Sequence, residues 1–224
     1  MNTHMIRILI LKDLRLVAVP VLGYLGGGML AIGLMTIPLS GCFYAGTVLL
    51  ITALMALGFH PPMATLIGER KDQTLAFVMS LPITPTDYTV AKLAVNLLIF
   101  FVPWTILLAG SVSLIWLHPS LPNGLIPYDT ILFGAIAAGA VLILCVAIVS
   151  EAMPPTVGVQ IASNLVFQAV MYSASNNPVI KAGMQGEAVV WSAPVLAYWG
   201  AYSAIMLLGL ATAVWRQARK TSFI

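Results

Sequence analysis

The stretch from Thr130 to Ser150 decides the fold: it reads TILFGAIAAGAVLILCVAIVS and contains no charged residue. A helix of this length extends about 30 Å, which is the thickness of the hydrocarbon core of a bilayer. Asp129 precedes the stretch as an expected helix cap, and Glu151 follows it at the other end. The stretch therefore predicts a transmembrane helix.

Five more apolar stretches lie before and after this one in the sequence, separated by short polar breaks. The chain of 224 residues is 60% hydrophobic and 8% charged, whereas about a quarter of the residues of a soluble domain are charged. This composition excludes a soluble globule, and the short breaks exclude a separate catalytic or nucleotide-binding domain. We predict an all-α membrane protein in which residues 1–224 form one domain with six transmembrane helices. The other five expected spans are 17–37, 43–66, 93–117, 157–175 and 191–215.

The distribution of cationic residues predicts the orientation, because Lys and Arg near the ends of spans remain on the cytoplasmic side. Six spans place nine of the ten Lys and Arg residues on one side and leave only Lys181 on the other. Both termini are therefore predicted to be cytoplasmic. The net charge of +3 follows from this topology, so no nucleic-acid partner is expected. In this scheme 17–66 holds two spans, 67–92 is cytoplasmic, 93–215 holds four spans, and 216–224 is a basic cytoplasmic tail.

Residues 1–16 are predicted to form an interfacial helix. At 100° per residue, Arg7, Lys12 and Arg15 project with His4 into one sector of the helix, and the aliphatic residues lie largely opposite. Such a helix lies on the inner leaflet, with its cations near the lipid head groups. Membrane lipid is thus an expected partner.

The longest cytoplasmic loop, GERKDQTLAFVMSLPITPTD, covers residues 68–87. After four consecutive charges it is amphipathic as far as Pro82, which predicts a short helix parallel to the membrane. Thr84 and Pro85 then provide a cap and a first helical residue, so the next span is predicted to begin in the cytoplasm. Such a projecting element is suited to receive force from a partner, although an ordinary positive-inside loop would have the same charges.

This loop resembles that of the ABC-2 type permeases, the membrane subunits of ATP-driven exporters. The resemblance consists of Glu-Arg/Lys-x-x-x-Thr-Leu, then Ser-Leu-Pro-Ile and a later Lys, and it extends to the six spans and the basic N-terminal helix. Many members have Gly before the Thr, where this chain has Gln73. The resemblance implies that the loop is a coupling helix that docks into an ATPase subunit. The implied coupling residues are Glu69, Arg70, Lys71, Asp72, Thr74, Leu81, Pro82 and Lys92.

The resemblance also implies partners and a location. ATP and Mg²⁺ would bind a separate ATP-binding cassette subunit, so this chain would be neither an enzyme nor a cofactor carrier. The resemblance implies a second permease copy and favours a homodimer over a heterodimer. The implied location is a bacterial plasma (inner) membrane. No metal site is expected, because His4, His60 and His118 lie in three different places without ligands at suitable spacing.

Amide side chains recur every four residues on the expected fifth span and form one polar stripe. The stripe either lines a translocation path or makes hydrogen bonds between helices. The resemblance places the second span opposite. No ionisable residue stands clearly near mid-bilayer, which disfavours proton coupling and favours an apolar or amphipathic substrate such as a drug, peptide or lipid-like molecule. The candidate path residues are Gln160, Asn164, Gln168 and Tyr172, with Thr52, Met55 and Phe59 opposite.

Two alternatives to this exporter remain open. A permease for haem export would share the spans and the loop. A membrane scaffold subunit that transports nothing would use the loop as a docking site for another protein.

Overall fold

The computed structural model describes residues 3–73 and 85–219, and every regular element in them is helical. The all-α prediction is confirmed for this part of the chain. The elements are α1 (Thr3–Met35), α2 (Ser40–Pro62), the π-helical segment η1 (Met63–Ile67), α3 (Gly68–Lys71), α5 (Pro85–Leu117), α6 (Leu125–Ser150), α7 (Met153–Asn176), α8 (Pro178–Met184) and α9 (Ala193–Ala218).

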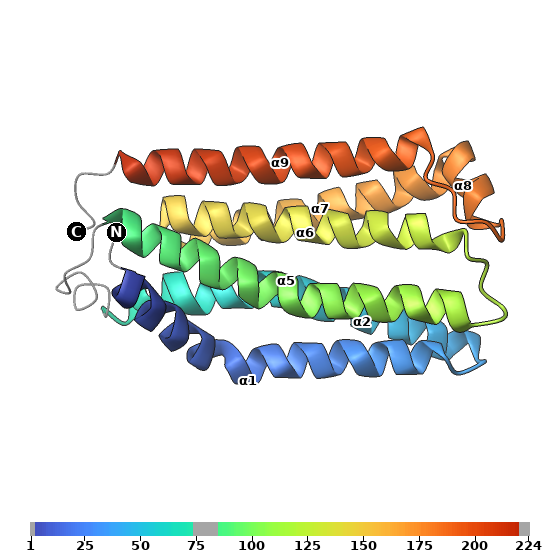
Figure 1. Ribbon diagram of the computed structural model, residues 1–224, viewed down its shortest axis with the longest axis horizontal. Helices are drawn as coiled ribbons and strands as arrows, with labels where there is room; N and C mark the ends of the chain where they lie inside the picture. The colour runs from blue at the N-terminus through green and yellow to red at the C-terminus, as the bar shows by residue number, and fades with distance from the viewer. Residues whose placement is uncertain (1–2, 74–84, 220–224) are drawn as a thin grey trace.

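The long helices lie side by side along the long axis of a bundle (Figure 1). The start of α1 and the end of α9 lie at the same end, and α8 lies at the opposite end. All described Lys and Arg residues except Lys181 belong to segments that meet at the first of these ends. We call it the charged end.

Five helical stretches in the described residues are long and apolar enough to cross a membrane. The chain is therefore a multi-pass membrane protein by length and composition. The expected fifth span, at residues 157–175, forms a helix of sufficient length, α7, but this helix is less apolar than the other five, because amide and hydroxyl side chains interrupt its apolar surface. The five stretches are Met5–Met35, Ser40–Lys71, Asp87–Leu117, Leu125–Ser150 and Ala193–Ala218.

The N-terminal region differs from the prediction, because α1 continues without a break through the expected boundary between residues 16 and 17. Leu9, Asp13 and Val17 are buried and lie at intervals of four residues, on one helical face. Leu9 belongs to a cluster with Tyr88 and Val17 to a cluster with Val95, so this face packs along α5 on both sides of the boundary. The expected interfacial segment is therefore the first part of α1, and its buried face packs against α5.

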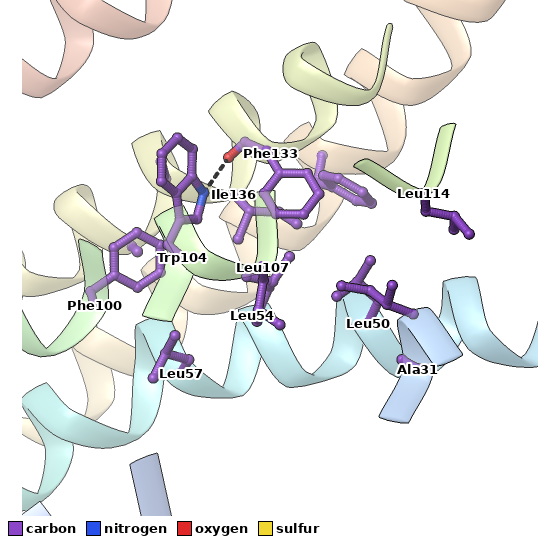
Figure 2. Close-up of a cluster of buried hydrophobic side chains, with 14 residues drawn as sticks. Ala31, Leu50, Leu54, Leu57, Phe100, Trp104, Leu107, Leu114, Phe133 and Ile136 are labelled. Atoms are coloured by element: carbon purple, nitrogen blue, oxygen red, sulfur yellow. Dashed lines mark hydrogen bonds between the residues drawn. The ribbon is translucent and has the colours of Figure 1, made fainter. Parts of the chain in front are cut away.

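Helix α6 forms the centre of the bundle, with α2, α5, α7 and α9 around it. The main core cluster joins α6 to α2 and α5 (Figure 2). In it, the Trp104 Nε1–H donates to the carbonyl of Phe133 at 3.1 Å, which satisfies the only polar group of a buried ring. Helix α6 begins at Leu125, more than one turn before the expected start at Thr130, so Asp129 lies within the helix instead of capping it.

A buried ionic cluster as the candidate functional site

Lys92 is the centre of a cluster of charged side chains near the charged end. Its side chain is 1% exposed. The ammonium group lies 2.7 Å from Asp13 Oδ2, 2.7 Å from the Thr65 carbonyl oxygen and 2.8 Å from Glu69 Oε1. An ammonium group has three N–H donors, so these three acceptors can use all of them. A buried lysine is tolerated only with partners of this kind.

The two carboxylates of the cluster have partners of their own. Lys12 forms an ion pair with Glu69, and its Nζ lies 3.3 Å from Asp13 Oδ1. The Tyr88 hydroxyl donates to Glu69 Oε2 at 2.9 Å. Two ammonium groups and two carboxylates therefore compensate each other, and the cluster has no net charge.

A second set of hydrogen bonds connects the cluster to a distorted part of the second span. Pro61 and Pro62 end α2, and the π-helical turn η1 follows directly. The Thr65 hydroxyl donates to the Pro61 carbonyl at 2.8 Å, and Asn96 Nδ2 donates to the Thr65 hydroxyl at 3.0 Å and to the Lys92 carbonyl at 2.9 Å. These bonds hold the backbone where proline removes a helical N–H. π-Helical turns of this kind occur frequently at functional sites.

The cluster joins residues on both sides of the segment 74–84 to the rest of the bundle. Asp13 lies on α1, Glu69 on α3 before residues 74–84, and Lys92 on α5 after them. From Lys92 to the end of α5 at Leu117 the helix extends about 38 Å, which exceeds the hydrocarbon core of about 30 Å. The cluster therefore lies near one membrane boundary and links three helices there.

Further polar contacts connect helices at the same end of the bundle, beside the buried cluster. Arg70 forms an ion pair with Glu151, at the end of α6. Gln217, on α9, donates to the Ile148 carbonyl and, at 3.4 Å, to Glu151 Oε1. The helices α3, α6 and α9 are thereby linked beside the cluster.

Four exposed residues directly precede residues 74–84, namely Arg70, Lys71, Asp72 and Gln73. Gln73 has a φ of 56°, a left-handed conformation that glycine adopts without strain and other residues adopt at a cost. The backbone at this position would therefore accommodate glycine without strain.

The implied coupling residues fall into three groups. Glu69 and Lys92 are 5% and 1% exposed and face the interior of the chain itself. Arg70, Lys71 and Asp72 are exposed at the entrance to the loop. Thr74, Leu81 and Pro82 lie outside the described residues. A partner protein can therefore touch the second group without rearrangement, whereas the first group can act only through other residues of the chain. Of the expected interfacial residues, Arg7, Lys12 and Arg15 are all exposed.

The structure brings together only part of the expected translocation path. Met55 on α2 and Gln160 and Asn164 on α7 line one cavity of about 20 Å³, which is enough for a single water molecule. Gln160 Nε2 donates to Asn164 Oδ1 at 3.1 Å, and Gln160 Oε1 is buried without a hydrogen-bond partner. Gln168, Tyr172 and Thr52 are exposed, and Phe59 is half-buried away from this cavity.

Four members of the polar cluster were not predicted from the sequence, namely Asp13, Thr65, Tyr88 and Asn96. Asp13 had a detectable signal, because it is the one charged residue on the apolar face that includes Leu9 and Val17. Thr65 and Asn96 had none, because single hydroxyl and amide side chains occur throughout membrane helices.

A scan against protein-family models, a search of the curated proteins and a search of the solved structures each return no match to this chain. The resemblance to ABC-2 permeases therefore stays a prediction from the residues of the loop.

Proposed function

We propose that the chain is the permease subunit of an ATP-driven exporter of the ABC-2 type. A separate ATP-binding cassette subunit would bind ATP and Mg²⁺ and dock at the charged end, which would be cytoplasmic in a bacterial inner membrane. The substrate would be hydrophobic or amphipathic. Helix α7 would be the fifth of six spans, so that both termini are cytoplasmic.

The observation that carries this proposal is the buried cluster of Asp13, Glu69 and Lys92. It joins Glu69, before residues 74–84, and Lys92, after them, to each other and to Asp13 on α1 through ion pairs of 2.8 and 2.7 Å. A force applied to the loop by a partner would move these helices together, since the buried charges cannot separate cheaply. Transport needs such a rigid connection, because the ATPase and the substrate occupy different places.

The docking contact would be made by the exposed residues Arg70, Lys71 and Asp72 and by the loop that follows them. The path would form beside Met55, Gln160 and Asn164, where a cavity of about 20 Å³ is too small for a drug-sized molecule. Alternating access would enlarge it, with a second copy of the chain covering the exposed side of α7. The buried Gln160 Oε1 has no hydrogen-bond partner, so water would bond to it when the path opens.

Co-purification tests the proposal. The tagged chain, isolated from its host membrane in mild detergent, should bring down a protein with ATPase activity. Lys71→Glu should reduce the amount of this ATPase severalfold, because Lys71 is exposed next to the loop. Lys181→Glu is the matched control, since Lys181 is exposed on α8 at the opposite end. If no ATPase is recovered, or if both variants lower its recovery equally, the proposal is wrong.

A further inference from the structure

A groove between α6 and α9 near the charged end is not explained by the proposed transport function. Its volume is about 410 Å³, within the range of small-molecule sites. Leu142, Cys145 and Val149 form its α6 wall, and Gly209 and Ala213 contribute to its α9 wall. The spacings of three, four and seven residues place each set on one helical face. The walls are therefore mainly apolar along much of the groove.

The depth of the groove depends on Gly209. A Cβ atom at this position would lie 3.5 Å from Cys145 Sγ and from Leu142 Cδ2, in ordinary contact. A longer side chain would extend into the groove. Only 11% of the most apolar stretch of α9 is buried within the chain, and Leu208 beside Gly209 is 67% exposed. The groove thus lies on a helix that is largely uncovered by the chain itself.

Cationic residues stand where the groove reaches the charged end. Arg216 lines the groove and is exposed. The guanidinium of Arg219, one turn further, lies 4.0 Å from the centroid of the Trp215 ring. The nearby carboxylate of Glu151 is paired with Arg70. It therefore does not neutralise the positive charges of Arg216 and Arg219 at this end of the groove.

We propose that this groove binds an anionic phospholipid, with one acyl chain between α6 and α9 and the phosphate beside Arg216 and Arg219. An apolar groove that ends in cations at a membrane boundary matches both halves of such a lipid. Basic sites between helices select anionic head groups in this way, and tryptophan is common at the same depth. Lipid binding in this groove does not depend on transport by the chain, so the two can be tested independently.

Quenching of Trp215 fluorescence tests the charge requirement. The full chain is placed in nanodiscs that contain phosphatidylglycerol or phosphatidylcholine with brominated acyl chains, and the signal of a Trp215→Phe variant is subtracted as background. Phosphatidylglycerol should bind more tightly. Arg216→Gln with Arg219→Gln should weaken its binding about 25-fold, from roughly fivefold for each cation. Arg15→Gln, at an exposed cation on α1, should leave binding unchanged.

A second pair of variants tests the shape of the groove. Gly209→Leu should fill it and reduce quenching by both brominated lipids. Gly200→Leu is the matched control, because Gly200 lies on the same helix and a Cβ there would meet nothing within 4 Å. Equal affinity for the two lipids, unchanged binding in Gly209→Leu, or displacement of phosphatidylglycerol by soluble glycerol phosphate at similar concentrations would each overturn the proposal. Loss of quenching on self-association of the chain would also overturn it, since a second copy would then occupy the groove.

Discussion

The buried cluster at the charged end and the amide stripe on α7 are both polar features of an apolar protein, but their surroundings differ. In the cluster, Lys92 has three acceptors within 2.8 Å and is 1% exposed. On α7, Gln160 has one amide partner, Asn164, and one buried oxygen without a partner. The rest of the stripe is exposed. Every charged group of the cluster has an oppositely charged partner within the chain, and Asp13 Oδ1, which has no hydrogen-bond partner, lies 3.3 Å from Lys12 Nζ. The unpartnered oxygen of Gln160 has no such compensating charge beside it among the partners that the structure describes.

This difference predicts that the two features contribute to function in different ways. Residues with all partners inside the chain should affect stability and the transmission of movement. Residues with unused hydrogen-bonding capacity should affect the chain's interactions, because water, substrate or another helix must meet that capacity. Measurements of the free energy of unfolding can distinguish the two cases.

The largest effect is expected for Lys92→Met. The variant leaves Asp13 and Glu69 with less compensation in the interior, which should lower the free energy of unfolding by about 3–5 kcal/mol. Thermal or denaturant unfolding in detergent would measure it. Lys181→Met, at an exposed residue, serves as the control. Adding Asp13→Asn and Glu69→Gln should recover part of the loss, and full stability of Lys92→Met alone would contradict the burial of the cluster.

A smaller loss is expected for Asn96→Leu. Its Nδ2 donates to the Thr65 hydroxyl and to the Lys92 carbonyl, so the variant should cost about 1–3 kcal/mol. The same unfolding measurement applies. Thr65→Val would remove the partner hydroxyl, and the double variant should cost less than the sum of the two single variants if the residues act as one network.

A gain in stability is expected for Gln73→Gly. The left-handed conformation, with φ of 56°, is strained for glutamine, and its relief should raise the free energy of unfolding by about 0.5–1 kcal/mol. Gln185→Gly is a suitable comparison, because Gln185 has φ of −91° and should gain nothing. A loss of stability in Gln73→Gly would show that the glutamine side chain has an additional role.

The smallest effect on stability is expected for Gln160→Met combined with Asn164→Leu. These amides bond mainly to each other, and replacing both members of a pair by apolar groups is nearly neutral, within about 0.5 kcal/mol. A loss comparable to that of Asn96→Leu would mean that the stripe is as complete as the cluster. With stability preserved, a change in ATP-driven transport by the reconstituted complex would be attributable to the path itself.

Particular residues show how far the sequence allows prediction. The start of α5 at Pro85 and the helical character of all long elements followed from capping chemistry and hydropathy. The unbroken α1 did not, because the contacts of Leu9 and Val17 with α5 are long-range and override a local change in composition. The burial of Glu69 and Lys92 was equally hidden, since both stand in segments that read as charged and exposed.

The sequence by itself determined that the chain is helical and built for a membrane, because the hydrophobic effect acts on composition and on the length of apolar stretches. The tertiary structure alone decided which charged residues face each other. Asp13, Glu69 and Lys92 lie on three helices far apart in the chain, and a buried charge is tolerated only where packing brings its partner within hydrogen-bond distance. That pairing depends on the rotation of each helix, which no local pattern in the sequence specifies.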